Sequence, residues 1–365
     1  MDNIPQEPVL YIVIGLVAIT LMVLALPLRV KKIGEHLEPF FLVMGIIAVS
    51  VSGLWSWGLV KDALKSPVMI GSVPIGIFQV VLIFGLLIHH FNKPFRNGIV
   101  NLADKLGPKI FLFLFIALLG LLSSVISVIV TACILAEVVA VLPFSRSHKI
   151  KTVVVTCFAA GLGAVLTPVG EPLSTILVNK LAGPPYHAGF FFPVDIFGIY
   201  VIPGVIALAI FGTIYIGRDI SLQTEMVDAK YTETLRGVIM RAVKVFIFIA
   251  ALILLGEGMK PIIVWYLDKV SPWALYWINT ISAVLDNATL TAVEIGPVMS
   301  RFQILSAILG LLIAGGMLIP GNIPNIVAAE RLKINMGEWA RIGVPLGLII
   351  MVIYFIALIF THTHV

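Results

Sequence analysis

Long apolar runs recur along this chain, and each is close to the roughly 20 residues that an α-helix needs to cross the hydrocarbon core of a bilayer. The clearest runs are Val9–Leu28, Phe40–Leu59, Val68–Ile88, Ile199–Ile216 and Ile342–Phe360. Only 12% of the residues are charged, whereas soluble domains contain about 25%. The alternation of polar and apolar residues that marks a transmembrane strand is absent. The sequence therefore predicts an all-α polytopic membrane protein whose main partner is the lipid bilayer.

The net charge of +5 has a simple cause in such a protein, because Lys and Arg gather in the loops on one side of the membrane. We therefore expect no nucleic-acid partner. The first residues, Met1–Glu7, are acidic and contain no Lys or Arg, which is unlike a signal peptide and favours an external N-terminus. The prediction is a multi-pass protein of the cell (inner) membrane with both termini outside. Cys133 and Cys157 lie in apolar segments and are expected to be buried free thiols.

Two segments are too long for a single crossing and contain polar residues near the middle. Ile110–Phe144 lies between two basic loops, so we predict a re-entrant helical hairpin that enters and leaves on the cytoplasmic side, with its tip at Ser127. Ile262–Ser300 is predicted to be a second hairpin that enters from outside, with its tip at Asp286 and Asn287.

A broken transmembrane helix follows each hairpin. The breaks are expected at Thr167–Pro172 and at Pro320–Asn325, because proline lacks the backbone N–H and its ring clashes with the preceding turn. Aligning Ser127 with Asp286 also aligns Ser123 with Ser282, so the chain contains two copies of one arrangement. Each copy crosses the membrane three times, which is an odd number, so the second copy is inverted. The expected organisation is two N-terminal transmembrane helices in residues 1–67, a first repeat in 68–217, a cytoplasmic linker in 218–236 and a second repeat in 237–361.

Helix-breaking, hydrogen-bonding residues at matching places in two halves of a membrane protein point to a transporter's binding site. Freed carbonyls at a break can bind a cation, and the N-terminal ends of the half-helices that follow can face an anion. A single Pro-Gly pair could be a kink without a ligand, but two related copies, each with a polar hairpin tip, argue against that. The predicted binding residues are Asp286, Asn287, Glu171, Ser127, Thr167, Gly170, Thr289, Gly321, Asn322 and Asn325.

Asp286 is the strongest candidate among them. An ionised carboxylate at membrane depth is costly and usually marks an ion pathway or a proton relay. With Asn287 and Thr289 beside it, it offers the oxygen ligands that hard cations prefer. We predict a Na⁺ site at Asp286, Asn287 and Glu171. The alternatives are that Asp286 is a loop residue at the outer surface and that Glu171 only binds local backbone.

Glu137 and Glu294 lie on the returning arms of the two hairpins. They are roughly 12–15 Å from the tips at 1.5 Å per residue, which is too far for direct contact with an ion bound there. They are candidates for a proton pathway, and the alternative for each is a paired or protonated helix residue.

The motifs resemble those of the ion transporter superfamily, which includes NhaD-type sodium/proton antiporters, arsenite-efflux permeases and divalent-anion/sodium symporters. Leu285-Asp286-Asn287 resembles the aspartate-asparagine hairpin motif of the NhaD type. Thr-Pro-Val-Gly-Glu at 167–171 is similar to that type's Thr-Pro-Ile-Gly-Asp break. Pro320-Gly321-Asn322 and Val-Ala-Ala-Glu at 327–330 resemble the arsenite-permease pattern.

The chain as a whole looks like a small prokaryotic family labelled as predicted cation transporters, and the resemblance covers both repeats. It departs from the NhaD type at the first hairpin, where Ser127-Val128 stands in place of Asp-Asn. Neither tip carries the Ser-Asn-Thr signature of dicarboxylate carriers, which counts against a carboxylate substrate. By analogy with fold relatives, a homodimer through the first two helices is an expectation.

The sequence therefore predicts a secondary active transporter, in the first place a Na⁺/H⁺ antiporter in which Na⁺ and H⁺ compete for carboxylates at the midplane during alternating access. The transported partner would be a small inorganic cation, and no resident cofactor is expected. The first alternative is a Na⁺-coupled anion symporter of the dicarboxylate or oxyanion type, and a channel is the second. An enzyme is not expected, because the sequence contains no Ser/His dyad, paired aspartates or His-x-x-x-His metal motif.

Overall fold

The computed structural model describes residues 4–5, 7–69, 76–217, 234–266, 270–285 and 287–362. Within these ranges all regular structure is helical. In this described part of the chain, five helices are long and apolar enough to cross a membrane. They are α1 (Leu10–Arg29), α7 (Pro108–Ile126), α11 (Phe192–Gly217), α12 (Leu235–Tyr266) and α17 (Met336–His362). The predicted helical membrane protein is therefore confirmed.

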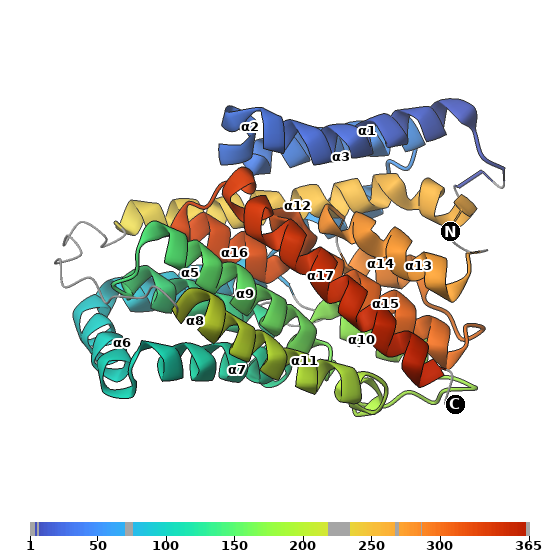
Figure 1. Ribbon diagram of the computed structural model, residues 1–365. Coiled ribbons are helices and arrows are strands. Elements are labelled where there is room, and N and C mark those ends of the chain that lie inside the picture. Colours follow the sequence, from blue (N-terminus) through green and yellow to red (C-terminus); the bar gives the residue numbers. More distant parts are fainter. Residues whose placement is uncertain are drawn as a thin grey trace.

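The N-terminal part forms a separate layer over α12 (Figure 1). It consists of α1, the short α2 (Lys31–Glu35) and α3 (Leu37–Ser52), and the next helix, α4 (Trp57–Lys65), packs against α12. The expected apolar run Phe40–Leu59 does not form one helix, because α3 ends at Gly53, whose φ of 70° is left-handed. The backbones of α3 and α12 approach closely at Gly45, where an added Cβ would lie 2.8 Å from the carbonyl oxygen of Ala251. Small residues at such a contact let two membrane helices pack tightly.

The first half of the remaining chain contains α5 (Ile77–His90), α6 (Asn92–Leu106), α7, α8 (Val128–Val141), α9 (Arg146–Ala164), α10 (Pro172–Lys180) and α11. Figure 1 shows α6 lying across one end of the bundle, nearly at right angles to the long helices. The helices α7 and α8 pack against each other and are joined by Ser127, whose φ is 70°. The helices α9 and α10 are separated by an irregular segment at the predicted break.

The second half contains α12, α13 (Pro272–Ile278), the 3₁₀ turn η2 (Asn279–Ala283), α14 (Asn287–Glu294), α15 (Arg301–Gly315), η3 (Ile319–Gly321), α16 (Ile323–Leu332) and α17. The start of α15 is fixed by a capping box, in which Ser300 accepts from the N–H of Gln303 and the Gln303 side chain accepts from the N–H of Ser300. Asn322 caps α16 by accepting from the N–H of Ile323. Local side-chain chemistry thus fixes the start of α15 and, at Asn322, the end of the second interruption.

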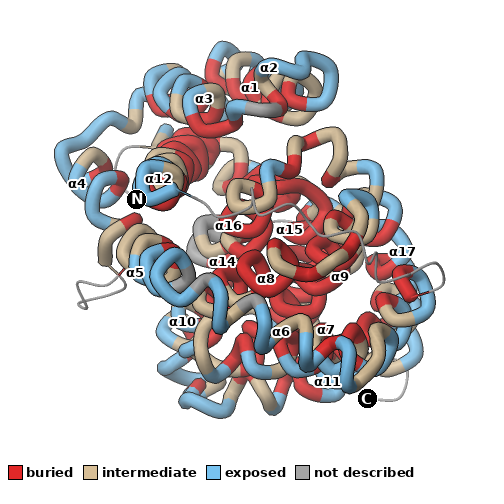
Figure 2. The backbone as a smooth tube through the Cα atoms, turned by 90° about the vertical axis from the view of Figure 1, so that its left-hand side faces the viewer, coloured by how far each residue is buried: buried red, intermediate tan, exposed pale blue. Residues whose placement is uncertain are grey.

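The helices α8, α9, α15 and α16 are buried over most of their length. In Figure 2 the buried tube gathers in α8, α9, α15 and α16, while exposed segments surround it. The helix α8 packs against α16, and α14 packs against α10. Each returning arm therefore contacts the second half of the interrupted helix from the other half of the chain.

The first residue of α1 and the last residue of α17 lie at the same end of the bundle (Figure 1). Which face of a membrane this end meets stays a prediction.

Candidate functional site

Four short helices begin around one cavity of about 250 Å³. Its wall contains Ile129, Pro172, Ala288 and Ile323, each the first or second residue of α8, α10, α14 or α16. The other lining residues are Ser66, Met69, Ile77, Ile249, Leu252 and Ile253. Each helix N-terminus carries a partial positive charge and unpaired N–H groups. Four positive helix ends therefore face a space that is otherwise mostly apolar.

The second interruption is held open by two asparagines that the sequence predicted. Asn325 is fully buried and donates through Nδ2 to the carbonyl oxygens of Gly315 and Leu318, both at 2.8 Å. Asn322 uses Oδ1 to accept from the N–H of Ile323 at 2.9 Å. These bonds satisfy backbone groups that the missing helical turn leaves unpaired, which is what a break inside an apolar core requires.

Oxygen atoms from η2, α14, α15 and η3 lie close together around Gly315 and Gly321, because neither glycine has a side chain to fill the space. A Cβ added to Gly321 would lie 2.5 Å from the carbonyl oxygen of Gly315 and 2.8 Å from that of Ser282. A Cβ added to Gly315 would lie 3.0 Å from the carbonyl oxygen of Gly321, and 2.7 and 3.1 Å from Nδ2 and Oδ1 of Asn287. Asn287 is 4% exposed, and within the described ranges neither of its amide atoms has a hydrogen-bond partner. The result is a buried group of carbonyl and amide oxygens, which we call the second-break cluster (Ser282, Asn287, Gly315 and Gly321).

The sequence predicted Asn287 and Gly321 in this cluster, and it missed the Gly315 and Ser282 carbonyls. Ser282 was visible as the serine that aligns with Ser123, but a backbone oxygen leaves no signal of its own in a sequence. Asp286, the strongest prediction, lies outside the described residues, and of Thr289 only the backbone, within α14, is described.

The first interruption is closed by its own hydrogen bonds. Thr167 donates through Oγ1 to the carbonyl oxygen of Ser124 at 2.5 Å, and the N–H of Val128 donates to the carbonyl oxygen of Gly170 at 2.7 Å. The carbonyl of Ser127 accepts from the hydroxyl of Thr131 at 3.0 Å. The structure thus brings Ser127, Thr167 and Gly170 together, as the sequence suggested, but protein groups already bind their oxygens.

Glu171 is 5% exposed and occupies the N-cap position of α10. Its side chain makes no capping hydrogen bond to α10. It directly precedes Pro172, which lines the cavity of about 250 Å³ between the four helix N-termini; we call this the central cavity.

Matching hydrogen bonds join α7 to α9 and η2 to α15. Ser123 donates to the carbonyl oxygen of Ala160 at 2.9 Å, and Ser282 donates to that of Leu311 at 3.0 Å. Each acceptor is the fourth residue before the end of its helix, α9 or α15. Beyond the breaks, the third residues of α10 and α16, Ser174 and Asn325, both donate back to a carbonyl on the other side of the break.

The two carboxylates proposed for proton transfer have opposite surroundings. Glu137 receives hydrogen bonds from Arg241 at 2.9 Å and from two nitrogens of Arg331 at 2.9 and 3.0 Å. Its side chain and that of Arg241 are each 3% exposed. The paired alternative for Glu137 is therefore favoured. Glu294 receives one hydrogen bond, from Nδ2 of Asn279 at 3.0 Å, and its other oxygen has no partner within the described residues.

The sequence missed both arginines of this buried triad. Arg241 lies in the long apolar helix α12, and a charged residue in such a helix is a signal of function in its own right. Its partner on α8 could not be found from the sequence.

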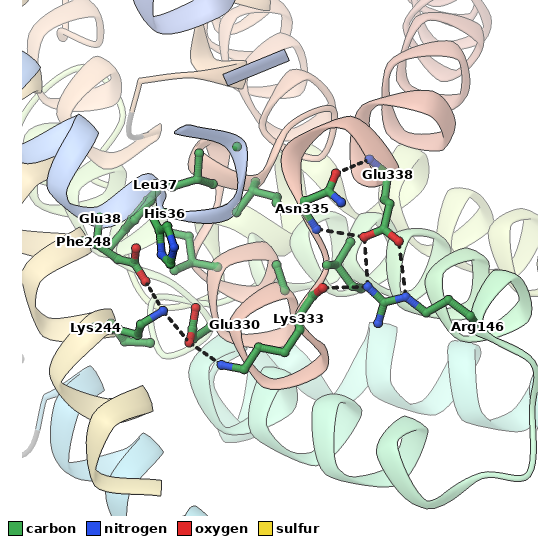
Figure 3. Close-up of a pocket in the computed structure, with 16 residues that line it drawn as sticks. His36, Leu37, Glu38, Arg146, Lys244, Phe248, Glu330, Lys333, Asn335 and Glu338 are labelled. Atoms are coloured by element: carbon green, nitrogen blue, oxygen red, sulfur yellow. Dashed lines mark hydrogen bonds and ion pairs between the residues drawn. The ribbon is translucent and has the colours of Figure 1, made fainter. Parts of the chain in front are cut away.

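A larger, charged cavity opens toward the second interruption (Figure 3). Its volume is about 430 Å³, and its wall extends from His36 between α2 and α3 to Ile319 in η3. We call it the charged vestibule. Its acidic and basic lining residues are Glu38, Glu330, Glu338, Arg146, Lys244 and Lys333. Since Ile319 lies two residues before Gly321, the vestibule leads toward the second-break cluster.

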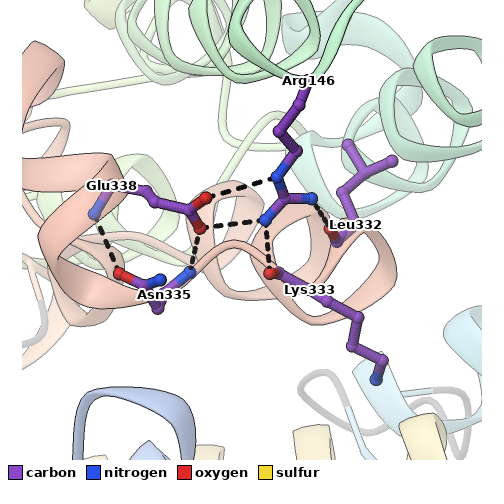
Figure 4. A network of polar contacts seen from close by, with 5 residues as sticks. All are labelled: Arg146, Leu332, Lys333, Asn335 and Glu338. Atoms are coloured by element: carbon purple, nitrogen blue, oxygen red, sulfur yellow. Dashed lines mark hydrogen bonds and ion pairs between the residues drawn. The ribbon is translucent and has the colours of Figure 1, made fainter. Parts of the chain in front are cut away.

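Arg146, the first residue of α9, forms hydrogen bonds with the segment that joins α16 to α17 on one wall of the vestibule (Figure 4). It donates to the carbonyl oxygens of Leu332 and Lys333 at 2.5 and 2.6 Å and to both carboxylate oxygens of Glu338 at 3.3 and 2.9 Å. Asn335 adds reciprocal bonds with Glu338. The corner between α16 and α17 is therefore fixed to the start of α9.

Within the described residues no group of three His, Cys, Asp or Glu side chains could hold a metal ion. Cys133 and Cys157 are buried free thiols, as expected.

The fold and the site define a helical membrane protein with two interrupted helices and buried polar groups at the interruptions. The chain belongs to the family described as Protein of unknown function (DUF1646), whose model matches residues 13–361. No curated protein matches the chain.

Proposed function

We propose that this protein is a secondary active transporter and, more specifically, a Na⁺/H⁺ antiporter. The observation that carries the proposal is the second-break cluster, where the amide of Asn287, without a described partner, lies beside Gly315 and the Gly321 carbonyl in a buried space. Interrupted membrane helices bind coupling ions through unwound carbonyls and the C-terminal ends of half-helices. Gly315 is such a C-terminal end.

The proposed architecture is a pair of inverted repeats, each with a re-entrant hairpin and a broken helix. The matching bonds of Ser123 and Ser282 support it, because repeats predict the same contact at the same position. The reciprocal packing of α8 on α16 and of α14 on α10 supports it as well. An inverted pair gives two related arrangements of one chain, and exchange between them would open the site to each side in turn.

The two halves would have different tasks. Hydrogen bonds close the first interruption. In the second-break cluster the Gly315 carbonyl accepts from Asn325, but the amide oxygen of Asn287 has no described partner and is available to a hard cation. Asp286 precedes Asn287 in the sequence and would supply the negative charge that a cation site in an apolar core needs. Protonation of a carboxylate removes that charge, so H⁺ and Na⁺ would compete for the same site.

Glu294 is the second carboxylate proposed to carry a proton, because its hydrogen bond from Asn279 is neutral and its other oxygen has no partner within the described residues. Glu137, held by two arginines, is proposed as a structural ion pair.

The four helix N-termini around the central cavity favour a second candidate, a Na⁺-coupled anion symporter. Positive helix ends that face one space would stabilise an anion there. The described residues that line the cavity include no Lys or Arg, which is why the antiporter is preferred.

Proteoliposomes loaded with a pH-sensitive dye test the proposal. Addition of Na⁺, Li⁺, K⁺ and candidate anions in turn should give a saturable proton flux that depends on Na⁺. Asn287→Ala and Asp286→Asn should abolish that flux, whereas Asn101→Ala and Asp62→Asn, at exposed positions on α6 and α4, should keep it. Wild-type flux in both site variants would disprove the proposed site. An uptake current that depends on an anion would favour the symporter.

A further inference from the structure

The charged vestibule contains equal numbers of acidic and basic side chains, and Lys244 holds a special position among them. Arg146 is committed to Glu338 and to backbone carbonyls, and Lys333 is 70% exposed and pairs with Glu330 on its own helix. Lys244, on α12, lies between carboxylates from two different walls. Its Nζ is 3.0 Å from Glu38 on α3 and 3.2 Å from Glu330 on α16 (Figure 3).

Both carboxylates are well shielded from solvent. The side chain of Glu38 is 8% exposed, that of Glu330 is 16% exposed and that of Lys244 is 26% exposed. A cation that moves along this wall toward Ile319 and the second break would therefore meet two carboxylates already occupied by an ammonium group. Because a lysine side chain is long and flexible, the ammonium can leave without unfolding the helix.

We propose that Lys244 acts as a tethered cation that competes with the transported cation for Glu38 and Glu330, and so sets the apparent affinity for that cation at the vestibule. This inference rests on the proposed function, since it takes the cargo to be a cation. Without Lys244 the vestibule loses one positive charge and its net charge becomes negative. A cation would then be attracted to the mouth and an anion would be repelled.

The first measurement is independent of transport. His36 lines the vestibule and is exposed, so His36→Cys places a reactive thiol at the mouth, while the native Cys133 and Cys157 stay buried. The ratio of its modification rates by a cationic and an anionic methanethiosulfonate reports the local potential. Lys244→Gln should raise that ratio about two- to fivefold, the range expected for a partly exposed ion pair.

Two variants serve as matched controls. Lys260→Gln removes a lysine from the same helix that pairs with Glu257 and is 32% exposed, but Lys260 does not line the vestibule. Lys244→Arg keeps the charge. Both controls should leave the ratio unchanged, and Lys244→Arg remains informative if Lys244→Gln folds poorly.

The second measurement is the KM for Na⁺, taken separately from each side of the membrane. Lys244→Gln should lower this KM about two- to fivefold on one side of the membrane only. An unchanged labelling ratio in Lys244→Gln would overturn the proposal. A raised ratio with an unchanged KM on both sides would also overturn it, because the vestibule would then not be the cation's path. A parent protein with no Na⁺-dependent flux would refute the proposed function, and the competition with it, whatever the labelling ratio.

Discussion

Replacing Glu137 by Gln should destabilise the protein strongly, because Arg241 and Arg331 would lose the buried carboxylate that bridges them. The triad contains three hydrogen bonds of 2.9–3.0 Å, and the three side chains are 3–9% exposed. Removing one partner of such a pair leaves uncompensated buried charge and costs about 3–5 kcal/mol. Gln keeps the volume and one acceptor, so a loss of this size would come from charge and not from a cavity.

The rate at which the native cysteines are labelled measures this loss of stability. Cys133 and Cys157 are buried free thiols, so a maleimide dye in detergent reacts with them only after the protein opens. When opening is fast relative to labelling, the rate follows the equilibrium population of the open form. A loss of about 3–5 kcal/mol then raises the labelling rate by roughly two to three and a half orders of magnitude.

Two further variants make this prediction specific. Glu257→Gln removes a partner of the Lys260 pair, where both side chains are about one-third exposed, and should cost about 0–1 kcal/mol. The double variant Glu137→Gln/Arg331→Gln removes one of the stranded charges and should recover part of the loss. A labelling rate in Glu137→Gln within about tenfold of the parent would refute the argument from buried charge.

Three other substitutions test the packing. Gly315→Ala places a Cβ 2.7 Å from Nδ2 of Asn287. It should abolish Na⁺-dependent flux and lower the free energy of unfolding by about 1–3 kcal/mol. The control Gly98→Ala, whose Cβ meets nothing within 4 Å, should preserve flux. Gly204→Ala drives a Cβ into the Tyr354 hydroxyl, so its unfolding temperature should fall, and adding Tyr354→Phe should restore part of the loss. Arg146→Gln frees the corner between α16 and α17 and should increase proteolysis there without changing the thiol labelling of the core.

The two interruptions differ in the hydrogen bonding of their polar groups, and this difference bears on the proposed transport mechanism. In the first, the Val128 N–H and the Thr167 hydroxyl occupy carbonyl oxygens. In the second, the amide of Asn287 is left without a described partner beside equivalent backbone groups. One ion site for the two halves is therefore the simplest arrangement, and a measured stoichiometry of one Na⁺ per cycle would agree with it.

Much of the fold could be predicted from local sequence. Apolar run length determines which segments form long helices, and proline, glycine and capping residues determine where they end. The predicted interruption at Thr167–Pro172 overlaps the irregular segment between α9 and α10. The one at Pro320–Asn325 was placed too late, because the irregular segment follows Gly315 and α16 already begins at Ile323. The run at Phe40–Leu59 was predicted too long, because Gly53 ends α3 in a left-handed conformation.

The sequence by itself determined the class of protein, the positions of the breaks and the residue types that lie there, since each of these depends on neighbouring residues. Only the tertiary structure decided that Glu137 pairs with Arg241 and Arg331, that Lys244 bridges Glu38 and Glu330, and that the carbonyls of Ser282, Gly315 and Gly321 meet at Asn287. These contacts join residues far apart in the chain, and several are made by backbone atoms that every residue possesses. Their partners are chosen by how whole helices pack, and no local pattern records that choice.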